Sequence, residues 1–291
     1  MKCRLFMFLV MVLKIWIVSG QSIDYRNFLN IRIGNRFPAA ECIMQDSLGM
    51  IWIGTYEGLF CYDGYSTYSH LFKDGKTGNY ISCGQVLDSR RLILGADSGI
   101  QFYNYLTDTY ENPGITFPPN IKAFLVQGDS LWICSLSGLY HYSFSTKKIE
   151  SIDLFKDCHV RYRVVYSIAE NNGVLYLGTY DGLCTYNQKT EKVQFFGLPD
   201  NKGSNKLVNF LLFDKIRKVL WVGAESALYQ FNVHNGQFIA IEDLSNISVR
   251  SMTLDDENNI VIGTDKGLFI SDGYHFHHAI HDVRNSFSLA S

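Results

Sequence analysis

The hydrophobic and polar positions of the chain repeat with a period of about 40 residues. Each repeat has an apolar run, a short polar turn and a second apolar run; the repeats begin at Ile51, Leu92, Leu131, Leu175, Leu220 and Ile260. The starts are separated by 41, 39, 44, 45 and 40 residues. A period of this length with strand-like content is typical of the blades of a β-propeller.

Each repeat predicts four strands. An apolar segment such as "AAECIMQD" leads through a turn into a strand such as "IWIG", and then come "GLFCYD" and the more polar "STYSHLF". Because successive side chains of a strand point to opposite faces, the unbroken apolar run "IWIG" needs cover on both faces. Blades packed face to face provide that cover. The sequence therefore predicts an all-β fold, a β-propeller of four-stranded blades with six recognisable repeats.

The turn inside each repeat carries a glycine in five of the six copies: Gly58, Gly99, Gly138, Gly182 and Gly267. Short hairpin loops usually need one residue with positive φ, which glycine adopts without steric cost. The fifth copy has Ala227 at this place, so we expect its turn to be strained or reshaped. We interpret the repeated Trp, Gly and Thr residues as structural, and predict no catalytic residue among them.

The first twenty residues have a different character. A basic start precedes a mostly apolar stretch from Leu5 to Val18, and the small residues Ser19 and Gly20 follow it. This pattern predicts a secretory signal peptide over residues 1–20 and a periplasmic location for the rest. Lys14 inside the apolar stretch is unusual, and an uncleaved membrane anchor is the alternative. No later segment has the run of about 18 apolar residues that a membrane helix needs.

The net charge and the cysteine content bear on the partners, disulfides and metal sites that the protein can have. The formal net charge is −2, and loss of the basic leader would make it more negative, so we expect no nucleic-acid partner. Six cysteines follow the leader: Cys42, Cys61, Cys83, Cys134, Cys158 and Cys184. A domain of this size does not need cross-links, so buried free thiols are favoured over disulfides. No Cys-x-x-Cys pair occurs, and no metal or cofactor is predicted.

The segment "QDSLGMIWIGTYEGLFCYDGY" closely resembles the two-component regulator propeller repeat. That repeat typifies the periplasmic sensor region of hybrid two-component regulators in Bacteroides-like bacteria. The resemblance covers nearly the whole chain after the leader and is strongest in the first, fourth and sixth repeats. It implies an exported, non-catalytic propeller that senses a ligand such as an oligosaccharide. The signal would pass to a membrane-bound signalling protein or to a second copy of the chain.

The resemblance also sets the expected domain boundaries. Residues 21–35 look like an N-terminal strand that closes the last blade, residues 36–282 hold six blades, and residues 283–291 look like a connector to a seventh. The kinase domain of such regulators does not occur in this sequence. We therefore expect a truncated sensor with an incomplete seven-blade ring. A six-blade ring that closes differently and a complete stand-alone protein are the alternatives.

The expected ligand-binding residues lie in loops around the mouth of the central channel. In propellers of this kind, the turns between second and third strands share that face with the blade connections. Aromatic rings beside carboxylates and arginines suit sugars, which offer hydroxyls and apolar ring faces. The candidates are Tyr56, Glu57, Asp97, Arg161, Arg163, Tyr180, Asp181, Glu225, Asp265 and Lys266. The competing interpretation is that loop tips are polar only because they are solvated.

Two polar segments resemble metal sites superficially. "GYHFHHAIHD" contains His275, His277, His278 and His281, but it lies on an expected outer strand, where exposed histidines without a metal are the favoured interpretation. "LDDENN" lacks the spacing of a calcium loop and predicts a hairpin turn.

Two other functions stay open at this point. A streptogramin-lyase-like propeller enzyme would require a metal held by histidine and glutamate at the channel mouth, and none of the repeat turns contains a histidine. A scaffold that binds another protein would use an aromatic-rich surface equally well.

Overall fold

The computed structural model describes residues 39–70, 80–111, 113–156, 163–199 and 206–282, with a few single residues beyond these ranges. The expected signal peptide (1–20), and nearly all of the expected closing strand (21–35) and connector (283–291), lie outside the described residues. The chain forms two compact units, and the larger, Ile31–His278, holds the blades. In the described part, no helix has the length and apolar character to cross a membrane.

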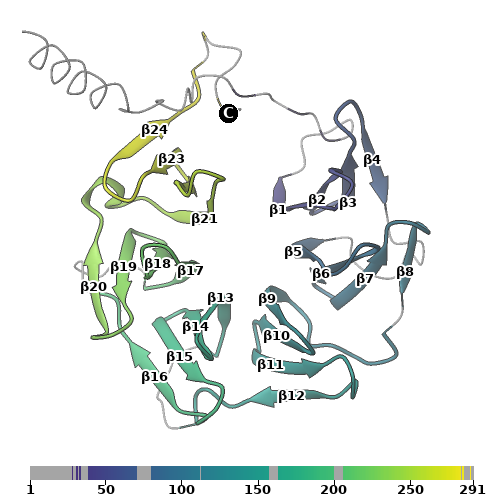
Figure 1. Ribbon diagram of the computed structural model, residues 1–291, viewed down its shortest axis with the longest axis horizontal. Coiled ribbons are helices and arrows are strands. Elements are labelled where there is room, and N and C mark those ends of the chain that lie inside the picture. Colours follow the sequence, from purple (N-terminus) through teal and green to yellow (C-terminus); the bar gives the residue numbers. More distant parts are fainter. Residues whose placement is uncertain are drawn as a thin grey trace, which may run out of the picture. The chain divides into compact units, whose positions relative to one another are not determined.

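Six antiparallel sheets of four strands follow one another around a ring (Figure 1), each with its strands in sequence order. Blade 1 contains β1 (Ala40–Gln45), β2 (Ile51–Thr55), β3 (Gly58–Tyr62) and β4 (Thr67–His70). Blade 2 contains β5 (Ile81–Val86), β6 (Arg91–Ala96), β7 (Gly99–Asn104) and β8 (Thr109–Glu111). Blade 3 contains β9 (Ile121–Gln127), β10 (Ser130–Ser135), β11 (Gly138–Ser143) and β12 (Ile149–Ile152).

The second half of the chain repeats the arrangement. Blade 4 contains β13 (Val165–Asn171), β14 (Val174–Thr179), β15 (Gly182–Asn187) and β16 (Val193–Phe196). Blade 5 contains β17 (Val208–Asp214), β18 (Val219–Ala224), β19 (Leu228–Asn232) and β20 (Gln237–Ala240). Blade 6 contains β21 (Val249–Leu254), β22 (Ile260–Thr264), β23 (Gly267–Ser271) and β24 (Phe276–Ala279). The predicted all-β propeller of six four-stranded blades is confirmed.

The hydrophobic core consists of layers between consecutive blades. Between blades 1 and 2, Trp52 and Leu59 pack against Leu92 and Tyr103. Corresponding clusters lie between each later pair of blades up to blades 5 and 6. Each blade therefore buries the apolar face of its neighbour, as the unbroken apolar strands require.

Glycine in the second strand lets consecutive inner strands approach closely. A Cβ atom on Gly54 would lie 2.7 Å from Ile81, and one on Gly223 would lie 2.5 Å from Val249. These partners are the first residues of the next inner strand. In blade 6, the atoms within 4 Å of a Cβ on Gly263 belong only to Ser251 of the same blade.

The outer faces of blades 1 and 6 differ from the interior faces. Inner strands pack on one another in order from β1 to β21, and within the described strands no comparable packing joins β21 to β1. Ile43 on β1 is 68% exposed. Ser251 and Thr253 of β21 are exposed. A seventh blade stays a prediction.

We call the turns that join second and third strands the T-x-x-G turns; in blades 1, 4 and 6 a threonine hydroxyl closes the turn. Thr55 Oγ1 donates a hydrogen bond to Gly58 O at 3.0 Å and accepts one from Glu57 N at 3.0 Å. Gly58 has φ 130°, as predicted for the repeated glycine. In blade 5, Ala227 does not adopt positive φ, and β19 begins one residue after it, so this turn is reshaped.

Five described cysteines are free thiols: Cys42, Cys61, Cys83, Cys134 and Cys184. The prediction of buried free thiols is confirmed for Cys61, Cys134 and Cys184, whereas Cys42 and Cys83 are free but half-buried. Cys158 lies outside the described residues. Burial raises the pKa of Cys42 to about 12 and that of Cys61 to about 11.

These raised pKa values predict inert thiols in the folded chain. At pH 8, the thiolate that reacts with alkylating agents would be about one part in a thousand or less. We expect iodoacetamide to leave Cys42 and Cys61 unmodified in the native protein and to modify both after denaturation, measured by peptide mass spectrometry. Rapid native labelling of Cys61 would contradict the packing between blades 1 and 2.

The close approach at the strand glycine predicts a position-dependent cost of adding a methyl group. Gly223→Ala should lower the free energy of unfolding by about 1–3 kcal/mol, because the new Cβ overlaps Val249. Gly263→Ala is the matched control and should stay within about 0.5 kcal/mol, since the Ser251 hydroxyl can rotate away. Urea denaturation of both variants measures the difference, and equal losses would contradict it.

Candidate functional site

Every inner strand contains a β-bulge near its first residue. The register with the second strand shifts around one residue in each blade, and these bulge residues are Glu41, Ser82, Lys122, Tyr166, Asn209 and Arg250. Bulges redirect a side chain and are over-represented next to active sites. Because Ala40 pairs with Thr55, this end of the inner strand lies beside the T-x-x-G turn. The bulge residues and the predicted loop residues therefore share one end of the blades.

Two bulge residues have a structural role between blades. Ser82 Oγ donates a hydrogen bond to Ile121 O at 2.6 Å. Asn209 Nδ2 donates one to Val249 O at 3.1 Å. Each acceptor is the first residue of the next inner strand, so both side chains bind consecutive blades together.

A stacked tyrosine pair lies at this end of blades 1 and 2. The rings of Tyr56 and Tyr80 are 4.5 Å apart between centroids, with 12° between their planes. Burial raises the pKa of Tyr80, and the nearby carboxylates of Glu41 and Asp97 raise it further. Tyr56 itself is 59% exposed. The site thus combines an accessible aromatic ring with two carboxylates, and Tyr56 and Asp97 are residues that the sequence predicted.

The predicted residues of blades 5 and 6 take part in contacts within the protein. Glu225 accepts a hydrogen bond from Asn209 Nδ2 at 2.9 Å and lies 3.4 Å from the Arg250 guanidinium. Asp265 Oδ1 accepts a hydrogen bond from Ser248 N at 2.9 Å. These bonds hold the connection between the two blades, which supports the structural interpretation for Asp265.

The remaining predicted residues belong to other turns and connections, except Glu57, which follows Tyr56 in the same turn. Lys266 Nζ donates a hydrogen bond to Asn246 O at 3.1 Å. Arg163 lies 3.7 Å from the Asp153 carboxylate, and both side chains are exposed. The other described candidates are Glu57, Tyr180 and Asp181, all in T-x-x-G turns. Arg161 lies outside the described residues.

Two residues at the tyrosine pair, Glu41 and Tyr80, were not predicted from the sequence. Glu41 is a bulge residue, and the strand pattern alone does not reveal a shift of register. Tyr80 precedes β5 in a blade connection, where no repeated motif marks it. A comparison of the residue just inside each inner strand would have been the available signal, because the position is polar or aromatic in all six copies.

The histidine segment forms local contacts. The His278 ring stacks on Phe269 with centroids 4.0 Å apart, and His278 Nε2 lies 2.8 Å from Lys266 O. His275 Nδ1 lies 3.1 Å from Asp272 Oδ2. Among the described residues, no group of three or more His, Cys, Asp or Glu side chains is arranged to hold a metal.

The chain is similar in sequence and fold to an extracellular domain of a bacterial two-component system. The chain is 40% identical over 91% of its length to the extracellular domain of a putative hybrid two-component system from B. thetaiotaomicron, with a TM-score of 0.83. The chain is similar to the sensor region of such systems. This confirms the likeness predicted from the repeats. A second structure describes the same extracellular domain as that of a putative one-component system.

Two further proteins are similar to the chain. The extracellular domain of another putative hybrid two-component system from B. thetaiotaomicron has a TM-score of 0.73 at 21% identity, and it shows the same fold. That match covers 93% of this chain and 38% of the other. "Histidine kinase P4" of Formosa agariphila is 28% identical over 226 residues, which is 67% of this chain and 16% of that protein. No family model matches the chain.

The propeller therefore corresponds to only part of its relatives. It spans 36% of the B. thetaiotaomicron extracellular domain and a smaller share of the kinase.

The bonds of the bulge residues predict unequal contributions to stability. Asn209→Ala should lower the free energy of unfolding by about 1 kcal/mol, because Val249 O and Glu225 lose a donor. Lys122→Ala, at the same bulge in blade 3, should change it by less than about 0.5 kcal/mol. Urea denaturation distinguishes the two, and an equal effect would show that the side-chain bond between blades is immaterial.

Proposed function

We propose that the chain is the ligand-sensing propeller of an exported two-component receptor in the periplasm. Its 40% identity to an extracellular domain of such a system supports this assignment. In the proposal the propeller is not an enzyme; it binds an oligosaccharide and passes the event to a membrane-bound signalling protein or to a second copy of the chain. Ligand binding can shift such a receptor only if the ligand binds one of its states more tightly.

The stacked pair of Tyr56 and Tyr80 is the observation that carries the oligosaccharide proposal. A sugar presents an apolar face that packs on an aromatic ring, and Tyr56 is accessible for this contact. The hydroxyls at the sugar edge can donate hydrogen bonds to the carboxylates of Glu41 and Asp97, which are the strong, charge-assisted kind. Aromatic face and acceptors therefore lie together at the end of blades 1 and 2 where the sequence predicted ligand contacts.

The residues at the tyrosine pair come from two blades, so a bound ligand could affect how these blades pack. Tyr56 belongs to a turn of blade 1, whereas Tyr80 and Asp97 belong to the connection and the turn of blade 2. A ligand that contacts all three would bridge two consecutive blades. Such a ligand would favour the state in which these blades are packed as they are here.

A binding screen with matched tyrosine variants tests this proposal. We expect at least one neutral oligosaccharide from a plant or algal glycan panel to bind the chain in isothermal titration calorimetry. Tyr56→Ala should weaken that binding by about fivefold or more, since aromatic contacts contribute about 1 kcal/mol beyond burial. Tyr65→Ala is the control, because this tyrosine is 94% exposed in the turn between β3 and β4, at the opposite end of the blade.

Two results would count against the proposal. One is a panel in which no glycan binds the folded chain. The other is equal weakening by Tyr56→Ala and Tyr65→Ala, which would place the ligand elsewhere.

A further inference from the structure

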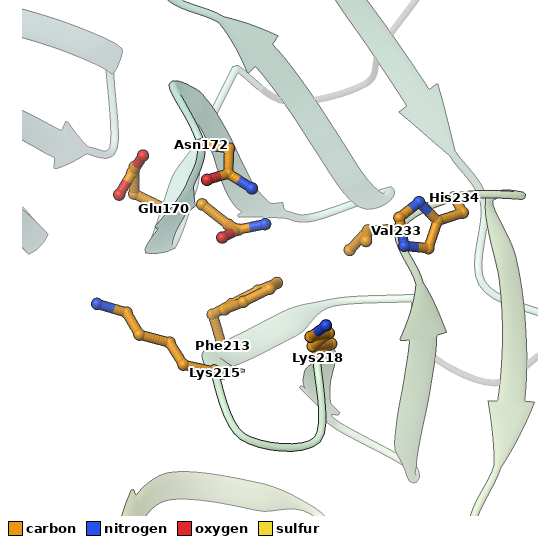
Figure 2. Close-up of a pocket in the computed structure, with 8 residues that line it drawn as sticks. Glu170, Asn172, Phe213, Lys215, Lys218, Val233 and His234 are labelled. Carbon is orange, nitrogen blue, oxygen red and sulfur yellow. The ribbon is translucent and has the colours of Figure 1, made fainter.

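A cavity of about 670 Å³ lies between blades 4 and 5 (Figure 2). Its walls come from the end of β13 and the turn that follows it, the end of β17 and the turn that follows it, and the start of the turn after β19. These turns join inner to second strands and third to fourth strands. They therefore lie at the opposite end of the blades from the T-x-x-G turns. The volume falls within the range of about 300–1,000 Å³ that is usual for ligand pockets.

An aromatic ring forms the middle of the cavity wall. Figure 2 shows Phe213 near the side chains of Glu170 and Asn172, with Lys215 and Lys218 lying on opposite sides of the ring. Phe213 is half-buried and stacks on Tyr176, with 6.3 Å between ring centroids and 24° between planes. Packing against a neighbouring blade thus holds the ring in place.

The cavity is lined by more positively charged than negatively charged side chains. Lys215 and Lys218 contribute two ammonium groups, and Glu170 contributes one carboxylate. One oxygen of Glu170 already accepts a hydrogen bond from Gly173 N at 2.8 Å. Among the described residues, neither lysine ammonium has an ion-pair partner. The cavity is therefore positive within a chain whose formal net charge is −2, and it favours an anion.

The backbone conformation at Lys218 makes this residue a suitable position for a substitution that keeps the fold. Lys218 has φ 55°, a left-handed conformation that is unfavourable for residues other than glycine and asparagine. The left-handed residue of the corresponding turn is Gly49 in blade 1, Gly128 in blade 3 and Asn258 in blade 6. In blade 4, Asn172 and the adjacent glycine are left-handed. Blade 5 thus carries a lysine where blades 1, 3 and 6 carry glycine or asparagine. Lys147 and Glu191 have the same left-handed φ in other turns, so the conformation alone does not mark a ligand site.

We propose that this cavity binds an acidic sugar unit. The carboxylate or sulfate group of the sugar would lie against Lys218, and the apolar face of the sugar ring would pack on Phe213. Lys215, which extends to the other side of Phe213 (Figure 2), would add to the positive potential of the cavity. The side-chain amides of Asn171 and Asn172 and the carboxylate of Glu170 offer partners for the sugar hydroxyls. This site shares no residue with the tyrosine pair of blades 1 and 2, so it does not depend on the function proposed for that pair.

Titration of the folded chain with three probes tests the proposal. The probes are digalacturonate, its uncharged methyl ester, and a sulfated galactose disaccharide, measured by calorimetry at low ionic strength, where charge pairs are least screened. We expect at least one acidic probe to bind, and the methyl ester to bind at least about tenfold more weakly than digalacturonate if the carboxylate is recognised. Preference between the two acidic probes identifies which anionic group the lysines recognise.

Lys218→Asn and Lys147→Asn form a matched pair of variants. Lys147 is an exposed lysine with φ 56°, in the turn between β11 and β12, and does not line the cavity. Asparagine suits a left-handed position, so both variants should fold with an unchanged or higher melting temperature. We expect Lys218→Asn to weaken binding of the acidic probe by about fivefold and Lys147→Asn to leave it unchanged. Phe213→Leu should weaken it as well, and Tyr56→Ala should not.

Several outcomes would overturn the proposal. The first is the absence of saturable binding by both acidic probes. The second is equal binding of digalacturonate and its methyl ester with no binding of the sulfated probe. The third is an equal effect of Lys218→Asn and Lys147→Asn in folded protein. Loss of binding in Tyr56→Ala would assign the acidic sugar to the other end of the blades.

Discussion

The packing of one blade against the next is the constraint on which the structure depends. A four-stranded sheet with two apolar faces cannot be stable alone in water, and here consecutive sheets bury each other's faces in successive layers. The strand glycines set how closely the blades approach, because Ile81 and Val249 occupy the space that a Cβ on Gly54 or Gly223 would need. Ser82 and Asn209 add hydrogen bonds between consecutive blades. Sites made by two blades are consequently held in place by the packing between those blades.

The two ends of the blades combine structural and functional side chains in different ways. At the T-x-x-G end, threonine hydroxyls close the turns, and the bulge residues vary in type from blade to blade. At the other end, Asp46 accepts hydrogen bonds from Leu48 N, Met50 N and Trp52 Nε1 and so fixes the turn of blade 1. Binding residues often lie on loops whose sequence varies while a rigid scaffold holds them in place. The tyrosine pair and the cavity near Phe213 are two such variations.

The sequence was sufficient for the features that depend on local patterns. The apolar run "IWIG", the recurring turn glycine and its replacement by Ala227 predicted the strands, the blades and the one reshaped turn, because each follows from the geometry of a single hairpin. Sites between blades could not be predicted in the same way. Glu41 and Tyr80 meet only because of a bulge and a blade connection, and Phe213 meets Asn172 only because blade 5 packs on blade 4. Arg163, a candidate because it lies in a blade connection, is 3.7 Å from the Asp153 carboxylate.

Hydrogen–deuterium exchange of the chain with and without neutral oligosaccharides would test most directly where the ligand is sensed. If the T-x-x-G end is the sensing face, a glycan that binds should slow amide exchange in the turn between β2 and β3 and in the segment around Tyr80. Exchange in the turn between β3 and β4, at the opposite end of blade 1, should not change. A bound neutral glycan that leaves the turn between β2 and β3 unaffected would contradict the account.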